Sequence, residues 1–485
     1  MTGLFGFTFA IGIIILSGVL ALNYTRIWQS FNLYAGLAIS YMLGMGVISL
    51  QMFAYSQLSV PFKIYSISAP WLVLAVVTVL FKPTRERLLV NTKINVKDAL
   101  KDISWPEIVL LLIILSQAFY AFLFGALLPI RGWDALQTWA FKGKVFFYDM
   151  GISYDFMKDP SNHSDYPLLI PLTFSWIYTS MGQVNDELVR MIYPLQYVSM
   201  LAIFYYAIRK VAVKRVSLLF TTLLSVTPII MVHTSGFIGR IGGLHSGDFV
   251  GYADLALSIF FLGAGAFFYL YLSEGNNAYL IMSVLFLTMG AWTKNEGLVF
   301  LLMGGILITV SLVIGKRIKY GAILAVWGFI WIVTLPWLIY KMHFHISSEY
   351  TPNMNAATVQ NNLSRLPYII KMFFYVLFRD TDLYNYTWHG YAISSLINIR
   401  ESFRNPLFSL HAMLLVQFAA YTFIYLISPL EIKFHIGTSI DRVIIHLTPL
   451  AIIVMAMNIN RLIYKRDGMG LSSGHEKPVR YQKKR

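Results

Sequence analysis

The sequence contains no cysteine and few charged residues. The absence of cysteine among its 485 residues excludes disulfide bonds and thiolate metal sites. Only 13% of the residues are charged, against about 25% in a soluble globular protein, and the mean hydropathy is +0.63. The apolar residues stand in continuous runs rather than in the alternating pattern of a membrane β-barrel. The composition therefore predicts an all-α, polytopic transmembrane helical protein.

Acidic residues are scarcer than basic ones, which gives the chain a net charge of +15 and a pI of about 9.6. The basic residues cluster in short segments between apolar runs and in the C-terminal tail. Because this distribution is typical of the positive-inside rule, we expect membrane lipids, and no nucleic acid, as partners. Residues 4–22 have no basic segment before them, so we expect a retained helix rather than a signal peptide.

The apolar runs set the expected number of membrane spans, since about 20 residues are needed to cross a bilayer as a helix. They predict about 13 spans, at residues 4–22, 31–52, 68–82, 107–128, 188–208, 216–233, 250–272, 277–293, 297–315, 321–341, 384–399, 407–428 and 440–458. Four basic groups then fall on one face, namely 82–101, 209–215, 316–319 and 461–485. The positive-inside rule makes that face cytoplasmic and puts the N-terminus outside. We expect a multi-pass protein of a prokaryotic cell (plasma) membrane.

Two further apolar segments, 167–183 and 365–378, bear on this count. A span at 167–183 would move every later basic group to the opposite face. We therefore expect both segments to form interfacial helices in the outer loops. Three regions follow: residues 1–104 with three spans and a cytoplasmic linker, residues 105–458 as the larger transmembrane module, and residues 459–485 as a basic cytoplasmic tail.

The most informative polar residue is Asp134, which follows an apolar span on the predicted outer face. An isolated aspartate at a span end is most often a solvated loop residue or a helix cap. Here we expect Trp133 and Trp139 to form an aromatic floor, and Lys142 and Lys144 to supply positive potential beside the carboxylate. Such a setting favours acid–base chemistry near an anionic lipid headgroup.

Further polar residues lie in the outer loops or near span ends on that face: His163, Asp165, Tyr166, Asp254, Lys294, Glu296 and Arg442. Each has an ordinary structural explanation as a helix cap, a helix-dipole partner, a turn residue or a snorkelling side chain. Lys294 and Arg442 are also of the residue types that bind a lipid phosphate. Because long loops on one face indicate where function lies, we expect these residues to share one outward-facing site.

This ordered pattern resembles the GT-C superfamily of polytopic glycosyltransferases, in particular the branch containing protein O-mannosyltransferases and aminoarabinose–lipid A transferases. That branch has a catalytic Asp after the first core helix and a proline-led aromatic segment. An acidic residue then opens a later helix, a lysine occupies an outer helix–helix turn, and an arginine comes late. The corresponding features here are Asp134, residues 165–176, Asp254, Lys294 in a TKNEG turn, and Arg442. The resemblance covers residues 105–458, and Ala135 stands where the family has a second acid.

The resemblance implies a glycosyltransferase that uses a polyprenyl-phosphate-linked sugar outside the cytoplasm and inverts the anomeric centre. A phosphate leaving group needs only cationic stabilisation, whereas an acceptor hydroxyl needs a general base. Asp134 would be the base, and Lys294 and Arg442 would bind the donor phosphate. The substrate-binding residues would be Trp133, Lys142, Asp165, Tyr166, Asp254 and Glu296. The acceptor would be a glycan, a lipid or a protein, and neither a cofactor nor a metal ion is indicated.

Two other functions fit the composition. An O-antigen-type polymerase or ligase would also use polyprenyl-linked sugars, with its essential residues in the late outer loop at His343, His345 and Arg365. A membrane transporter would place acidic residues along a path in mid-membrane. In this sequence the acidic residues cluster at span ends, and no pair of discontinuous helices with inverted symmetry is recognisable. These features favour the transferase.

Overall fold

The computed structural model describes residues 2–90, 103–236, 248–315, 320–404 and 406–466. All regular secondary structure in these ranges is helical, as the composition predicts. Parts of the predicted basic segments lie outside the described residues, namely 91–102 of the linker, 316–319 and 467–485 of the tail. Most of the predicted outer loop 234–250 also lies outside them, since residues 237–247 are not described.

Eight stretches in the described residues are long and apolar enough to cross a membrane. They contain the helices α1 (Thr2–Tyr24), α2 (Leu33–Gln57), α6 (Trp105–Leu127), α10 with α11 (Asp186–Arg190 and Ile192–Arg209), α14 (Asp254–Glu274), α16 (Asn295–Ile314), α17 (Tyr320–His343) and α23 (Leu407–Leu426). Each coincides with a span predicted from the sequence. The chain therefore has the architecture of a polytopic helical membrane protein.

Three helix pairs bend at a short break, and the total reaches 11 if each pair counts as one span. These pairs are α3 (Ile64–Leu80) with α4 (Lys82–Leu89), bent by 94°; α12 (Lys214–Ser225) with α13 (Pro228–Thr234), bent by 60°; and α24 (Ile432–Ile444) with α25 (Thr448–Arg466), bent by 45°. All three pairs overlap predicted spans, but the sequence analysis did not predict the bends.

The remaining two predicted spans are shorter than expected. The span at 277–293 is helix α15 (Asn277–Ala291) of 15 residues, which is apolar but short. The span predicted at 384–399 is wrong, because the helix there, α21 (Thr387–Ile397), has only 11 residues. At 1.5 Å per residue such a helix covers about 16 Å, roughly half of a bilayer core.

The two segments predicted to be interfacial differ from one another. Helix α19 (Leu366–Phe378) buries one side, including Ile369 and Phe373, and exposes the other, including Ile370 and Phe374. Helix α9 (Leu169–Met181) is instead buried at every residue and packs against α1, α2 and α7 (Ala140–Tyr148). The interfacial prediction for α9 is therefore incorrect, since the protein itself encloses the helix.

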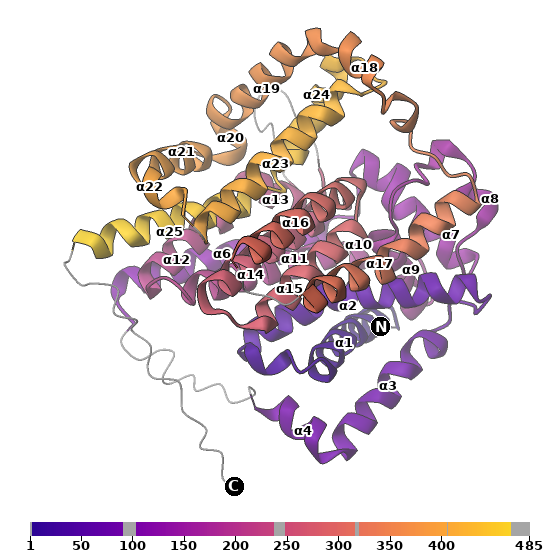
Figure 1. Cartoon of the computed structure of the whole chain (residues 1–485). Coiled ribbons are helices and arrows are strands. Elements are labelled where there is room, and N and C mark those ends of the chain that lie inside the picture. The colour runs from indigo at the N-terminus through magenta and orange to yellow at the C-terminus, as the bar shows by residue number, and fades with distance from the viewer. Residues whose placement is uncertain (1, 91–102, 237–247, 316–319, 405, 467–485) are drawn as a thin grey trace.

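The first two helices belong to the same core as the later ones. Helices α1 and α2 pack closely on each other and also on α9, and α2 packs on α11. Small residues allow this approach: a Cβ atom on Gly18 would lie 1.9 Å from the carbonyl oxygen of Ser40. Helices α3 and α4 lie at the edge of the molecule (Figure 1).

The predicted outer and cytoplasmic segments lie at opposite ends of the molecule (Figure 1). Helices α7, α8 (Tyr154–Met157) and α18 (Ala356–Asn361) lie towards the right of the view, whereas α12, α22 (Ile399–Ser402) and the last turns of α25 lie on the left. This separation is what a transmembrane arrangement requires, because loops of one side must share one end of the bundle.

Candidate functional site

Asp134 lies between the end of α6 and a π-helical turn, Ala135–Trp139, that leads into α7. Its side chain does not cap that turn. Instead, its Oδ2 accepts a hydrogen bond from Nη1 of Arg442 at 2.6 Å, and the side chain is 36% exposed. The helix-cap explanation of Asp134 therefore fails, and the carboxylate is the accessible member of an ionic network.

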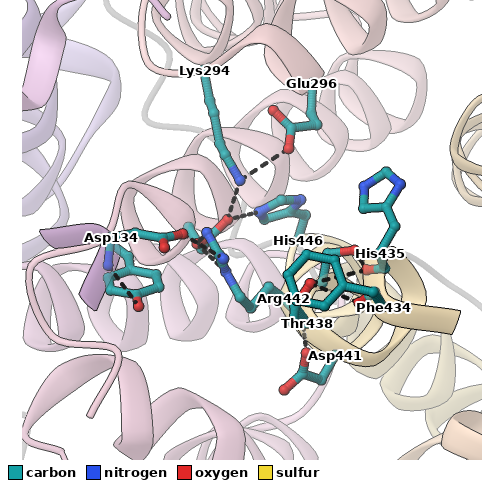
Figure 2. A network of polar contacts seen from close by, with 12 residues as sticks. Asp134, Lys294, Glu296, Phe434, His435, Thr438, Asp441, Arg442 and His446 are labelled. Carbon is teal, nitrogen blue, oxygen red and sulfur yellow. Dashed lines mark hydrogen bonds and ion pairs between the residues drawn. The ribbon is translucent and has the colours of Figure 1, made fainter. Parts of the chain in front are cut away.

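The centre of this network is Asp254, the first residue of α14, which is fully buried. Its Oδ1 accepts hydrogen bonds from Nζ of Lys294 at 2.7 Å and lies 3.0 Å from Nε2 of His446. Its Oδ2 accepts from Nε and Nη2 of Arg442, both at 3.3 Å. One carboxylate thus holds two cations side by side (Figure 2).

Lys294 stands in the turn between α15 and α16 and is only 4% exposed. It also forms an ion pair with Glu296 at 2.9 Å. Burial on its own would lower the pKa of Lys294, but the carboxylates of Asp254 and Glu296 outweigh burial and raise that pKa above its ordinary value. Lys294 therefore remains charged in the buried site.

Arg442, in the last turn of α24, and His446, in the break before α25, both reach Asp254. Side chains satisfy carbonyl groups at this break: the hydroxyl of Tyr384 donates to the carbonyl of Asp441 at 2.5 Å, and Ser258 donates to that of Ile445 at 3.0 Å. The break lets residues of one bent helix pair converge on a single carboxylate. The guanidinium of Arg442 also lies over a tyrosine ring, 4.5 Å from its centroid.

His446 and Tyr421 were missed by sequence reasoning. The Nδ1 of His446 lies 2.8 Å from the hydroxyl of Tyr421, while its Nε2 faces Asp254. Tyr421 is buried in the apolar helix α23, and His446 is buried in the break after α24. The available signal was the four-residue spacing of His446 from Arg442, which places two polar side chains near one another on a helix.

The segment that carries Asp134 is fixed against the start of α14. The backbone N–H of Asp134 donates to the hydroxyl of Tyr252 at 3.1 Å. Gly251 has φ +103°, and a Cβ atom there would lie 2.3 Å from the Cβ of Ala135. The buried Arg190 donates to the carbonyls of Pro129 and Ser235 and to the carboxylate of Asp248. These contacts position Asp134 beside the network.

Some predicted site residues lie elsewhere. Trp133 is 73% exposed whereas Trp139 is buried, so the two rings do not form the expected aromatic floor. Lys142 is fully buried and donates to the carbonyl of His163 at 2.5 Å, and Lys144 pairs with Asp186 at 2.6 Å. The amino groups of Lys142 and Lys144 are thus used for packing the outer segments, and the expected positive potential beside Asp134 comes from Arg442 instead.

Asp165 and Tyr166 lie at the Lys294 end of the network. The Oδ2 of Asp165 accepts from Nδ2 of Asn295 at 2.8 Å, and Asp165 does not cap α9. Burial raises the pKa of Tyr166 well above its ordinary value, and the carboxylates of Glu296 and Asp165 raise it further. The structure therefore groups Asp165, Tyr166 and Glu296 beside Lys294.

The residues predicted for a polymerase or ligase do not join the network. His343 and His345 are exposed at the end of α17. Arg365 donates to the carbonyl of Ser428 at 3.0 Å, which ties two outer segments together. Among the described residues, no three His, Asp or Glu side chains are grouped as metal ligands are.

Three helices begin at or next to the network: α14 at Asp254, α16 at Asn295 and α25 at Thr448. A helix N-terminus carries a partial positive charge and free N–H groups, so it favours anions. Arg442 directs three of its five N–H groups at the carboxylates of Asp134 and Asp254. The arrangement combines two cations, three helix N-termini and one accessible carboxylate, which suits a reaction with an anionic group.

No protein-family model, curated protein or solved structure matches the chain. The function is therefore argued from the geometry of the site.

Proposed function

We propose that the protein is a glycosyltransferase that moves a sugar from a polyprenyl phosphate to an acceptor hydroxyl on the extracytoplasmic face. The observation that carries this proposal is the contact of Asp134 with Arg442 at 2.6 Å within a network that also contains Lys294. Four residues far apart in the sequence, Asp134, Asp254, Lys294 and Arg442, meet at one point. The same four residues carry the resemblance to the GT-C superfamily.

The two cations fit the leaving group of this reaction. Lys294 and Arg442 both touch Asp254, so their positive charges are held next to each other (Figure 2). In a dry site, such preorganised charges stabilise a departing phosphate more strongly than water does. Asp254 is the positioning residue in this mechanism, because full burial prevents it from reaching a substrate.

Asp134 fits the general base. The acceptor oxygen attacks the anomeric carbon, the bond from that carbon to the phosphate oxygen breaks, and the polyprenyl phosphate leaves with the bonding electrons. The acceptor proton passes to the carboxylate of Asp134. Its 36% exposure gives an acceptor access to this group, unlike the enclosed carboxylate of Asp254.

The Asp134→Asn variant tests the proposal, because it keeps the shape of the side chain and removes its basicity. We expect transfer from a polyprenyl-phosphate sugar to fall by about 10²–10⁴-fold, the usual contribution of a general base. The measurement is turnover of the purified variant together with its melting temperature and donor affinity.

Asp155→Asn is the matched control, since Asp155 is an outer-loop carboxylate whose side chain is 82% exposed. Its turnover should equal that of the wild type. Wild-type turnover in a folded Asp134→Asn protein would rule out Asp134 as the base, and no transfer by the wild type from any polyprenyl-phosphate sugar would rule out the function.

A further inference from the structure

A second polar group lies at the Lys294 end of the network, and we call it the Glu296 cluster. Its members come from four separate parts of the chain: Asp165, Tyr166, Asn295, Glu296, Tyr350 and His435. Hydrogen-bond contacts join some of them, since Asn295 donates to Asp165 at 2.8 Å and the hydroxyl of Tyr350 lies 3.3 Å from Nε2 of His435. Glu296 connects the cluster to Lys294 at 2.9 Å.

The same two carboxylates, those of Glu296 and Asp165, raise the pKa of both tyrosines of the cluster. Burial raises the pKa of Tyr350, and the carboxylates of Glu349, Glu296 and Asp165 raise it further. Burial likewise raises the pKa of Tyr166, with Glu296 and Asp165 adding to the effect. Both hydroxyls therefore keep their protons, and that of Tyr350 is available to donate to its histidine neighbour.

Two buried polar atoms of the cluster lack a partner among the described residues: Oε2 of Glu296 and Nδ1 of His435. The His435 residue is only 9% exposed, and the Glu296 side chain is 15% exposed. In Figure 2 the ring of His435 projects from α24 on the side where the carboxylate of Glu296 is drawn. Buried polar groups are nearly always hydrogen-bonded to protein or to water, so these two atoms need a partner from beyond the described residues.

The chemistry of the two atoms defines the ligand group. A carboxylate oxygen accepts hydrogen bonds and cannot donate. We assign to His435 the neutral tautomer in which Tyr350 donates to Nε2, so that the ring proton is on Nδ1, which then donates. A hydroxyl group is both a donor and an acceptor, so one hydroxyl satisfies both atoms.

We propose that the Glu296 cluster binds one sugar hydroxyl, which donates to Oε2 of Glu296 and accepts from Nδ1 of His435. This inference rests on the proposed glycosyl transfer and assigns its sugar specificity. A sugar lacking that hydroxyl leaves two buried groups unpaired. Sites of this kind discriminate strongly against the deoxy analogue, whereas an apolar pocket does not.

The test measures binding of farnesyl phosphate, of farnesyl-phosphate-linked hexoses and pentoses, and of their mono-deoxy analogues to the full-length protein by calorimetry. For the sugar that binds best, loss of one hydroxyl should weaken binding about tenfold or more. The Glu296→Gln and His435→Phe variants should lose this discrimination. Tyr350→Phe, which keeps both unpaired atoms but frees Nε2, should reduce it.

The exposed His343 provides the matched control, because His343→Phe removes an outer-loop imidazole outside the cluster. This variant should retain the discrimination of the wild type. Melting temperatures identify variants that remain folded. Equal binding of every deoxy analogue by the wild type would overturn the proposal, as would discrimination that persists unchanged in folded Glu296→Gln and His435→Phe proteins.

A sugar hydroxyl can belong to the donor or to the acceptor. Methyl glycosides of the same sugars, titrated with farnesyl phosphate present, separate these sources. Discrimination among the linked sugars assigns the hydroxyl to the donor, discrimination among methyl glycosides assigns it to the acceptor, and discrimination in neither overturns the proposal. The proposed function fails independently if Arg442→Lys leaves farnesyl phosphate binding unchanged, whatever the sugar selectivity.

Discussion

At the scale of single residues, Asp254 is the buried carboxylate that contacts three basic side chains, those of Lys294, Arg442 and His446. It is fully buried and holds Lys294 and Arg442, which are also largely enclosed. Removing one partner of a buried ion pair costs about 3–5 kcal/mol, because a charge is left uncompensated. Asp254→Asn breaks two buried ion pairs, but Lys294 keeps Glu296 and Arg442 keeps Asp134 as partners. We therefore expect a loss of up to this size in the free energy of unfolding, measured by denaturant titration in detergent.

The control for this variant is again Asp155→Asn, whose ion pair with Lys158 is exposed. Exposed pairs contribute little to stability, so its unfolding should match that of the wild type. Equal stability of Asp254→Asn and wild-type protein would mean that the buried network is not ionised as described.

Lys142 gives the protein a predictable pH dependence. Full burial lowers its pKa from 10.5 to about 7, although the carboxylate of Asp165 opposes the shift. Below about pH 7 the amine is protonated in both the folded and the unfolded state. The folded state then bears the full free-energy cost of burying the charge. Between about 7 and 10.5 the unfolded state binds more protons, so stability rises with pH across this window.

We therefore expect the melting temperature of the wild type to rise more between pH 7 and pH 10 than that of Lys142→Met. The exposed Lys158 supplies a matched control, and Lys158→Met should keep the wild-type slope, since its side chain is 55% exposed. Parallel slopes in the wild type and Lys142→Met would show that Lys142 is not responsible.

Charge patterns in the sequence placed several site residues on one face but did not reveal their partners. Asp134, Asp254, Lys294 and Arg442 all stand at span ends, which is why the positive-inside rule could group them. The hydrogen bonds of His446 could not be predicted, because a histidine within an apolar run has the same pattern whether or not it meets a carboxylate. Burial of Lys142 likewise depends on segments that only the fold brings together.

At the scale of helices, breaks position the site, and side chains stabilise those breaks. The hydroxyl of Tyr197 donates to the carbonyl of Ser225 at 2.9 Å, and the amide of Asn385 donates to that of Val226 at 3.2 Å. Tyr384 donates likewise to the carbonyl of Asp441 in the last turn of α24, just before its break with α25. Non-helical backbone at membrane depth is tolerated when its polar groups are satisfied within the protein.

Tyr384→Phe should weaken the bend that carries Arg442. The carbonyl of Asp441 also accepts a hydrogen bond from the backbone N–H of Ile445, so the variant loses one buried hydrogen bond but leaves no carbonyl unsatisfied. A typical intramolecular hydrogen bond contributes about 0.5–1.5 kcal/mol, and we expect a loss of this size in the free energy of unfolding. Tyr386→Phe is the matched control, because Tyr386 is two residues away and 70% exposed. If both variants unfold like the wild type, the hydrogen bond to Asp441 does not stabilise the break.

Hydropathy located most helices but could not describe their surroundings. The apolar run that became α9 has the composition of a membrane-contacting helix, yet α1, α2 and α7 enclose it. In the run at 384–399, Asn385 has φ +51°, so the helix begins only at Thr387, and it ends at Ile397. Apolarity measures preference for a dry environment, and lipid and protein interiors both provide one.

At the scale of the whole molecule, the site lies with the segments predicted to be outside, and this sidedness is testable. Because the chain has no cysteine, single cysteines can be introduced without background labelling. Exposed positions are available at both ends: Tyr148 and Met354 on the predicted outer side, and Glu86 and Phe403 on the predicted cytoplasmic side.

We expect cysteines at Tyr148 and Met354 to react with a membrane-impermeant maleimide in intact cells. Those at Glu86 and Phe403 should react only after permeabilisation, because the basic connectors hold their side in the cytoplasm. Complete reversal of labelling would place the network of Asp254 on the cytoplasmic face, where the proposed extracytoplasmic transfer is impossible. Helix α21 alone is too short to span the membrane, so Phe403 reaches the cytoplasmic side only if α19, α20 (Thr381–Tyr384) and α21 together carry the chain across. Reversal of labelling at Phe403 alone would show that they do not.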